Sequence, residues 1–424
     1  MYDSSEMILT ALNHRQPARL PIDFGGSGWS GLHCTCVAAM RNTLGLEKHP
    51  VKIHDMGQML GYVDNDLADA MEVDVVQVMP PSITFGNAIG EWREWTTPWG
   101  QDVLIPKEAA LSVDANGDVL IHPQGDIEAP ASGRLPKSGF YFDNIIRDPG
   151  FDEDTLNPED NLEEFTVLAD SALSRMADSA AIARATGRAV AMGLPNASFS
   201  NINNVPGQSL KRPKGIRDLE EWYMSMVTRP EYLGAVFEGQ KKIMLHNLQL
   251  LLNAVGAANC DVLCLCGADF GTQNGLLCAE SVLRELILPH YKEVNAWVHQ
   301  NTSWKTVKHC CGAVEPLMEF FIDAGFDAVN PVQCSAFGMN PRLLKERYGA
   351  RLVFWGGGVE TQGVLSLGAP EDVRREALER CEIFSKGGGF VFTSVHNVQP
   401  LTPVENIMAM LNAVREFNGQ FMLG

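Results

Sequence analysis

The sequence lacks the features that mark membrane, secreted and nucleic-acid-binding proteins. No apolar run approaches the roughly 18–20 residues that a membrane-spanning helix needs. The N-terminal stretch has no basic segment followed by an apolar one, so we see no secretory signal peptide and expect a cytoplasmic chain with reduced thiols. Basic side chains are scarce: 33 Lys and Arg stand against 52 Asp and Glu. The formal net charge of −19 argues against a nucleic-acid binder.

Short apolar segments alternate with amphipathic ones along most of the 424 residues. We expect eight strands, in the ranges 18–25, 74–80, 189–195, 260–267, 304–312, 327–332, 351–358 and 389–397. Helices are expected between them, including one over 161–187, one over 230–255 and one over 279–300 that Pro289 kinks or breaks. Buried strands alternating with helices predict an α/β fold with a parallel sheet. Eight strands predict a (β/α)8 TIM barrel, and an open doubly wound sheet is the alternative.

One stretch departs from this alternation. Residues of about 90–145 carry short alternating runs around Asn116, Gly117 and Asp118, which predict a β-hairpin. The acidic stretch 147–161 contains Pro and Gly and is typical of a surface linker. We therefore expect a single barrel domain over residues 1–424, with an early inserted β-excursion.

Reactive side chains gather where the predicted strands end. In a barrel, the chemistry takes place at the C-terminal ends of the strands. The candidates there are Asp269, Gln273, His309, Cys310, Cys311, Gln333, Cys334, Glu360, His396 and Asn397. Two imidazoles and several thiols thus converge on the face where a barrel builds its site.

His309 and Cys311 form the centre of the predicted site. Because side chains alternate along a strand, these two point the same way and Cys310 points the other way. They can act as two metal ligands, and His396 on a later strand can return to the same mouth as the third. Three protein ligands with an open fourth position are typical of catalytic zinc. Cys334 is the reserve ligand if His396 points away.

Other interpretations of these residues stay open. A strand-end histidine is often only hydrogen-bonded. A Cys with a His can be a nucleophile with its base, although two residues on one strand are poorly placed for proton transfer. The cysteines of 260–266 have poor metal-ligand spacing and indicate buried packing. The Gly-rich "WGGG" and "KGGGF" fit no phosphate-binding fingerprint and indicate tight turns.

Three segments of the C-terminal half resemble segments of a known protein family. They are "GADFGTQNGLL", with its D-x-G-T-Q pattern, "VKHCCG", with a His-x-Cys-Gly pattern, and the closing "FVFTSVHNVQPLTPVENIMAM". In them the chain resembles the uroporphyrinogen decarboxylase superfamily, and within it the corrinoid-dependent branch of the methylcobamide:coenzyme M methyltransferases. Over residues 1–210 the likeness is weaker and is carried by "LNHRQPARLPID" and "MEVDVVQV".

The resemblance implies a barrel with Zn²⁺ at its mouth, bound by His309 and Cys311, and a catalytic segment with Asp269 and Gln273. In the thiol-methylating relatives the third ligand is a Cys of the closing segment, and the matching residue here is His396. One thiolate is thereby lost and the zinc keeps more positive charge. This departure favours a methyl donor such as a methoxy compound, or a folate acceptor, over a thiol.

The function implied by this resemblance is methyl transfer between a corrinoid and a small molecule. The sequence has no Asp-x-His-x-x-Gly motif, so we expect the cobalamin to be carried by a partner corrinoid protein. One alternative is a metal-independent tetrapyrrole decarboxylase or lyase in which Asp269 stabilises a cationic intermediate. However, the matching stretch "PIDFGGSGWSGLHC" lacks the arginines with which the decarboxylase grips substrate carboxylates. Another alternative is a non-catalytic corrinoid-binding protein, and whether the chain forms a homodimer stays open.

Overall fold

A parallel β-barrel forms the centre of the protein. The computed structural model describes residues 3–194, 197–202 and 204–421. Within them, seven parallel strands form one sheet in the order β18-β17-β16-β15-β14-β13-β4. The strands are β4 (Val75–Val78), β13 (Ala189–Gly193), β14 (Val262–Gly267), β15 (Lys305–His309), β16 (Ala328–Asn330), β17 (Val353–Trp355) and β18 (Phe390–Val391).

Residues 20–23 fill the eighth position and close the barrel between β18 and β4. On one side, Ile22 bridges Phe392 in parallel, and the backbone N–H of Asp23 donates to the Phe392 carbonyl at 2.9 Å. On the other side, the N–H of Asp74 donates to the Ile22 carbonyl at 2.8 Å. The predicted (β/α)8 barrel is therefore confirmed, and the open doubly wound sheet is excluded.

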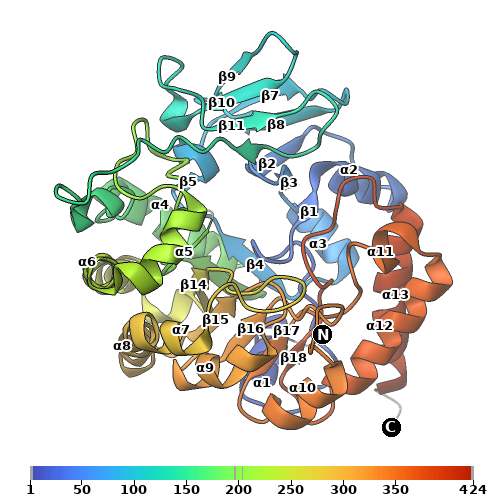
Figure 1. Ribbon diagram of the computed structural model, residues 1–424. Helices are drawn as coiled ribbons and strands as arrows, with labels where there is room; N and C mark the ends of the chain where they lie inside the picture. The colour runs from blue at the N-terminus through green and yellow to red at the C-terminus, as the bar shows by residue number, and fades with distance from the viewer. Residues whose placement is uncertain (1–2, 195–196, 203, 422–424) are drawn as a thin grey trace.

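Helices surround the barrel (Figure 1). They are α2 (Cys34–Thr43), α3 (Asn65–Met71), α4 (Asp170–Arg184), α5 (Leu219–Thr228), α6 (Pro230–Val255), α7 (Glu280–Leu286), α8 (Leu288–Asn301), α9 (Met318–Asp323), α10 (Pro341–Tyr348), α11 (Val364–Leu367), α12 (Pro370–Phe384) and α13 (Val404–Phe421). Pro289 lies in the first turn of α8, directly after the break from α7, as its missing N–H requires. The expected break at Pro289 is confirmed.

The helix expected over 161–187 is shorter than predicted. α4 begins only at Asp170, and the residues before it run outside the helix. Asn247 of α6 explains this, because its side chain accepts from the Leu168 N–H and donates to the Thr166 carbonyl, both at 2.9 Å. These backbone groups are satisfied without an α-helix, which sequence periodicity could not reveal.

The barrel interior is apolar at its N-terminal end. α1 (Ser4–Leu12) places Ile8, Ala11 and Leu12 in one buried cluster with inward-facing strand residues. Val307 of β15 and Trp355 of β17 belong to the same cluster. Since alternate residues of a strand share a face, the residue two positions after Val307 also faces the interior.

The region before α4 adds two further sheets. One contains β1 (Leu32–His33), β2 (Val51–Asp55), β3 (Leu60–Gly61), β7 (Trp92–Thr96) and β8 (Asp102–Pro106) in the order β1-β3-β2-β8-β7, and the other contains β9 (Ala110–Val113), β10 (Val119–His122), β11 (Gly133–Leu135) and β12 (Asp143–Asn144). A small antiparallel pair is formed by β5 (Ser82–Ile83) and β6 (Asn87–Ala88). The hairpin expected around Asn116 is confirmed by the antiparallel pairing of β9 with β10. Figure 1 shows β7 to β11 at the top of the view, beyond the barrel.

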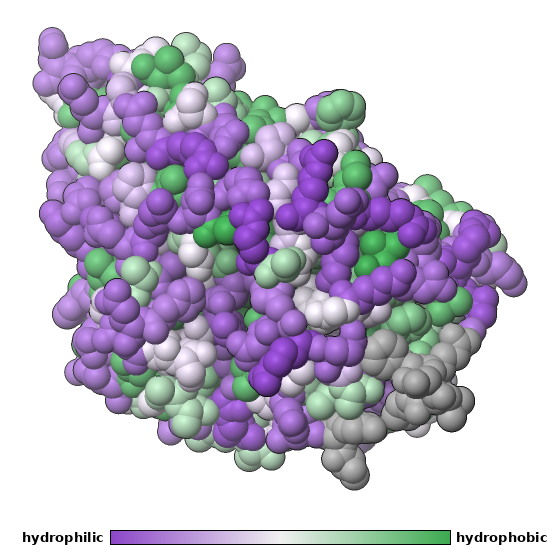
Figure 2. Space-filling view, turned by 90° about the horizontal axis from the view of Figure 1, so that it is seen from below, coloured by the Kyte–Doolittle hydropathy of each residue, from purple (hydrophilic) through white to green (hydrophobic). Residues whose placement is uncertain are grey.

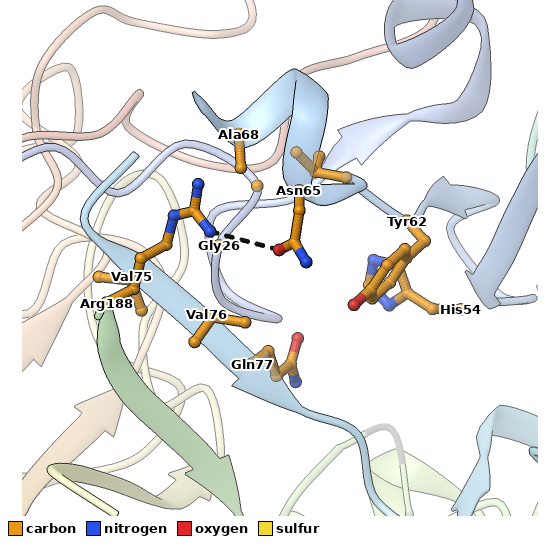
Figure 3. Close-up of a pocket in the computed structure, with 11 residues that line it drawn as sticks. Gly26, His54, Tyr62, Asn65, Ala68, Val75, Val76, Gln77 and Arg188 are labelled. Carbon is orange, nitrogen blue, oxygen red and sulfur yellow. Dashed lines mark hydrogen bonds between the residues drawn. The ribbon is translucent and has the colours of Figure 1, made fainter. Parts of the chain in front are cut away.

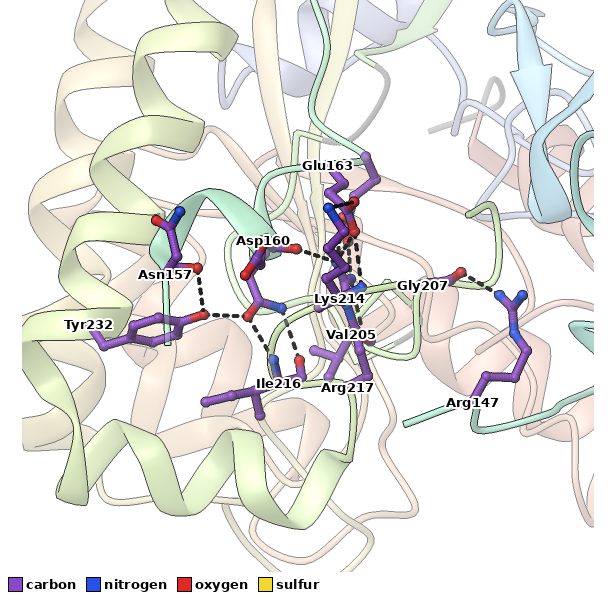
Figure 4. A network of polar contacts seen from close by, with 12 residues as sticks. Arg147, Asn157, Asp160, Glu163, Val205, Gly207, Lys214, Ile216, Arg217 and Tyr232 are labelled. Atoms are coloured by element: carbon purple, nitrogen blue, oxygen red, sulfur yellow. Dashed lines mark hydrogen bonds and ion pairs between the residues drawn. The ribbon is translucent and has the colours of Figure 1, made fainter. Parts of the chain in front are cut away.

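Arg217 anchors the loop that follows β13. Its guanidinium is fully buried, pairs with the Glu164 carboxylate at 2.9 Å and donates to the Asp160 carbonyl at 2.7 Å. Burial raises the pKa of Glu164, and the charge of Arg217 opposes that rise. Figure 4 shows the polar network around Arg217. Nearby, the Tyr232 hydroxyl of α6 donates to the Asn161 side chain at 2.7 Å. The network fixes this loop at the C-terminal end of the strands.

One face of the molecule is largely polar. On the face that lies below in Figure 1, hydrophilic side chains predominate and apolar ones form separate patches (Figure 2). Among the described residues, we find no helix that has both the length and the apolar character to cross a membrane.

Candidate metal centre

The first two residues of the site lie at the end of β15 and just after it. His309 is the last residue of the strand and faces the same side as Val307, and Cys311 lies two residues further along the chain. The His309 Nε2 atom lies 3.4 Å from the Cys311 Sγ atom. In a tetrahedral zinc site, neighbouring S and N ligand atoms lie about 3.5 Å apart, given the usual metal–ligand bond lengths. The pair is therefore already spaced as two ligands of one metal ion.

The chain after β18 brings the third residue. His396 contacts His309 edge to face, with ring centroids 5.8 Å apart. One ligand atom each from His309, Cys311 and His396 lies within 4.8 Å of the others. No other group of three His, Cys, Asp or Glu residues among the described residues meets the same criterion. Two imidazole nitrogens and one sulfur are a donor set that suits Zn²⁺.

Asn330 fixes the orientation of the His309 ring. The Asn330 Nδ2 group donates to the Trp355 carbonyl at 2.8 Å, which turns the Asn330 Oδ1 atom towards His309. That oxygen lies 2.7 Å from the His309 Nδ1 atom and can only accept, so the Nδ1–H group donates the hydrogen bond. His309 is thereby held in the tautomer whose Nε2 lone pair faces Cys311, the arrangement that a metal-binding histidine needs.

Asp269 adds a carboxylate beside Cys311. It lies in the loop after β14, and its Oδ1 atom accepts from the Cys311 backbone N–H at 2.7 Å. The Tyr223 hydroxyl donates to the Asp269 carbonyl at 3.1 Å and braces this loop from α5. Gln333 contributes similarly, because its side-chain oxygen accepts from the Gly312 N–H. The chain around Cys311 is thus held from two neighbouring loops.

Burial controls the protonation of the three residues. Burial, and to a lesser extent the nearby His309, lower the pKa of His396 to about 4. Burial also lowers the pKa of His309, against the opposing effect of Asp269. For Cys311, burial raises the thiol pKa well above its usual value, and Asp269 adds to the rise. At neutral pH the metal-free site therefore presents two neutral imidazoles and one thiol.

Five other predicted residues lie elsewhere. Two of them accept from backbone N–H groups outside the cluster: Glu360 from that of Gln362 and Asn397 from that of Gly31. Gln273 is exposed, and its side-chain amide donates to the Ser335 carbonyl at 2.9 Å, so it joins two loops. Cys310 is fully buried on the opposite face of the chain and accepts from the Phe270 N–H at 3.2 Å. The Cys334 thiol is close to Arg380 and Glu376 of α12, and burial raises its pKa to about 12. Of the two candidates for the third ligand, the structure brings His396 to the cluster.

Asn330 is the member of the site that the sequence analysis missed. Strand β16 is only three residues long, and the residues predicted at its end, Gln333 and Cys334, lie beyond Asn330. The available signal was the register of a barrel, in which His309 of β15 lies beside Asn330 of β16. A polar residue in this position relative to a suspected ligand is a natural hydrogen-bond partner.

A small polar cavity lies beside the barrel, between α3 and β4. It is lined by Gly26, His54, Tyr62, Asn65, Gln77, Arg188 and neighbouring apolar residues. Figure 3 shows Arg188 donating to the Asn65 side chain across the cavity, a bond of 3.3 Å. Its volume of about 20 Å³ has room for one water molecule and not for a substrate. None of its lining residues belongs to the metal centre.

Comparisons with known proteins agree with this architecture. Residues 146–417 match the model of the uroporphyrinogen decarboxylase (URO-D) family. Uroporphyrinogen decarboxylase from three strains of Coxiella burnetii is 27% identical over 173 residues, which are 39% of this chain and 44% of that enzyme. The match thus spans less than half the length of these curated relatives. A solved methyltransferase from Methanosarcina mazei superposes with a TM-score of 0.56 and 15% identity, covering 98% of this chain and 99% of that one. This last likeness is one of fold.

Proposed function

Because the chain belongs to the uroporphyrinogen decarboxylase (URO-D) family, we propose that it is a zinc-dependent methyltransferase that moves a methyl group between a corrinoid and a small molecule. The observation that carries the proposal is the convergence of His309, Cys311 and His396 on one point at the ends of the barrel strands. Decarboxylation of a tetrapyrrole gives no role to such a cluster. Methyl transfer to or from a heteroatom does.

Each residue of the cluster has a defined task in this proposal. His309, Cys311 and His396 would hold the metal, and Asn330 keeps the Nε2 lone pair of His309 available for it. Asp269 places a carboxylate beside Cys311 and balances positive charge there. Bound in this site, zinc would supply a Lewis acid for the leaving heteroatom of a methyl donor, or lower the pKa of an acceptor.

The ligand set supports one class of small molecule over another. With two imidazoles and a single thiolate, the site has less negative charge than one with two thiolates, so it polarises a bound heteroatom more strongly. This favours a methoxy donor, whose oxygen must leave, or a non-thiol acceptor such as a folate. The corrinoid would then receive the methyl group from the donor, or give it to the acceptor.

The corrinoid would be presented by a partner protein. Large apolar side chains stay exposed in the segments that follow barrel strands: Leu277 after β14, Phe337 after β16, Leu367 at the end of α11 after β17, and Leu401 after β18. Exposed apolar groups collected at one end of a barrel support docking of another protein there. A partner that presents a wide, flat corrin ring over the strand ends suits this arrangement.

The likeness to the Coxiella burnetii enzyme favours uroporphyrinogen decarboxylation as a second candidate. The loop after residues 20–23 is where arginines would be needed to hold substrate carboxylates, and it contains none. Instead, Asp23 is fully buried and accepts from the hydroxyls of Ser27 and Ser30 and from the Trp355 Nε1 group. We therefore expect no decarboxylation. Release of carbon dioxide from uroporphyrinogen at an enzymatic rate would favour the second candidate.

Cobalt absorbance tests the methyl transfer directly. The zinc-loaded protein is mixed with cob(I)alamin and methoxy donors, and separately with methylcobalamin and folate or thiol acceptors. We expect a spectral change in one direction, which assigns the half-reaction, and no change with metal-depleted protein. Absence of change in both mixtures, with zinc bound and a corrinoid protein supplied, would contradict the proposal.

Asp269→Asn tests whether the carboxylate acts in the reaction. The asparagine keeps an oxygen that accepts from the Cys311 N–H and removes only the charge. We expect turnover to fall about tenfold, which corresponds to about 1.4 kcal/mol, while the melting temperature changes little. Asp55→Asn is the matched control, because Asp55 also accepts from a loop N–H, that of Gln58, but lies outside the site. Loss of the melting transition in Asp269→Asn would show a structural role instead.

A further inference from the structure

Lys308 lies next to the metal-binding residues and faces away from them. It is the neighbour of His309 in β15, and its side chain is completely buried on the side of the helices. The Lys308 Nζ atom donates to the Ala268 carbonyl at 2.6 Å and to the His309 carbonyl at 2.9 Å. A buried lysine is rare, because desolvation of the ammonium group is costly unless it is hydrogen-bonded. These two hydrogen bonds offset part of that cost.

Three aromatic rings surround the same amino group. The Lys308 Nζ atom lies 4.6 Å from the centroid of Phe270, 5.8 Å from Tyr291 of α8 and 5.9 Å from Phe321 of α9. Ring faces attract a cation and partly replace the water that it has lost. Together, the rings and the carbonyls hold the side chain in one position.

The two carbonyls belong to the two segments that build the site. Ala268 immediately precedes Asp269, and His309 is itself a ligand of the proposed metal. The parallel pairing of β14 with β15 ends at Gly267 and His309, so the sheet no longer holds the chain beyond these residues. Lys308 bonds both segments at this point. It therefore fixes the separation between the Asp269 loop and the chain that carries His309 and Cys311.

We propose that Lys308 is a positioning residue of the metal centre: it ties the ends of β14 and β15 together so that His309, Cys311 and Asp269 keep the geometry that metal binding requires. This inference rests on the proposed metal-dependent function. Lys308 itself lies outside the site, yet it sets the spacing of the groups inside the site. The effect should therefore appear in the metal coordination itself, before any turnover is measured.

Lys308→Met, with Co²⁺ as a spectroscopic probe, tests the inference. Methionine keeps the length and apolar stem of the side chain and removes the amino group. We expect the affinity for Co²⁺, measured by competition with a chelator, to fall about tenfold, and the visible bands of bound Co²⁺ to shift or broaden. Lys345→Met is the matched control, because the Lys345 Nζ atom also donates to a backbone carbonyl, that of Gly388 at 2.6 Å, away from the site. We expect Lys345→Met to keep the affinity and the bands of the unaltered protein.

The outcomes separate the inference from the proposed function. If the unaltered protein binds no Co²⁺ or Zn²⁺, the metal-dependent function itself fails. If it binds and folded Lys308→Met matches it in affinity and spectrum, the positioning role is wrong. Should Lys308→Met not fold, Phe270→Leu removes the nearest ring and keeps the lysine, and we expect it to change the bands in the same sense by a smaller amount. Unchanged bands in that variant would also contradict the inference.

Discussion

Replacement of either strand-end ligand, in His309→Ala or Cys311→Ala, is expected to abolish stoichiometric zinc binding. Each variant leaves only two of the three converging ligands, and two ligands do not hold zinc in a catalytic site. Methyl transfer should fall by about a thousandfold or more, because Lewis-acid stabilisation worth several kcal/mol is lost. The measurements are zinc content by metal analysis and the rate of change of the cobalt absorbance.

Cys310→Ala is the matched control for this pair. Cys310 is adjacent to both ligands in sequence, yet its sulfur is fully buried on the other face and accepts from the Phe270 N–H. We expect this variant to keep one zinc per chain, with some loss of stability from the vacated space. If both His309→Ala and Cys311→Ala keep the zinc content of the unaltered protein, the proposed metal site is wrong.

The affinity for zinc should also depend on pH in a defined sense. Burial keeps His309 and His396 neutral at pH 7, since it lowers both pKa values, whereas the raised pKa of Cys311 keeps the free thiol protonated. Metal binding must then release one proton, from Cys311. Between about pH 6 and 8, the apparent affinity should rise about tenfold per pH unit. An affinity that does not change with pH would mean that the thiol is not a ligand.

Local sequence patterns were sufficient to predict the barrel and the shared face of His309 and Cys311. Each of the eight predicted ranges contains a segment of the barrel, because a strand buried on both faces must be continuously apolar wherever it lies in the sheet. Pro195, at the end of the range 189–195, lies outside the described residues. The shared face of His309 and Cys311 follows from the two-residue period of a strand alone. The placement of His396 needed one more assumption, that the chain closes into a barrel.

Contacts between distant segments were not predictable in the same way. The parallel pairing of β2 with β8 joins two strands from separate parts of the N-terminal region. The sequence of neither strand indicates with which other strand it pairs. The late start of α4 depends on Asn247, a residue of another helix. The side chain of Gln273 was expected at the site and instead bonds Ser335 on a neighbouring loop, so its catalytic role stays a prediction.

Asn330→Leu is expected to weaken zinc binding about 10- to 100-fold, the usual effect of removing the hydrogen-bond partner of a metal-bound histidine. Leucine is similar in size but cannot accept from the His309 Nδ1 group, so the ring is no longer held in the tautomer with a free Nε2 lone pair. Asn330→Asp keeps the accepting oxygen but also loses the donor to the Trp355 carbonyl, so we expect its affinity to lie between those of Asn330→Leu and the unaltered protein. Affinities are measured by chelator competition at one pH.

Loss of stability has to be separated from loss of orientation, because Asn330→Leu also leaves the Trp355 carbonyl without its 2.8 Å bond. That deficit costs about 1–3 kcal/mol in any buried site. Asn295→Leu creates the same deficit elsewhere, since the buried Asn295 Nδ2 group donates to the Ala324 carbonyl at 2.7 Å. We expect the two leucine variants to lose similar stability and only Asn330→Leu to lose zinc affinity. If both keep the original affinity while folded, Asn330 does not orient a metal ligand. If both lose it equally, general loosening of the barrel, and not the His309 tautomer, controls the metal.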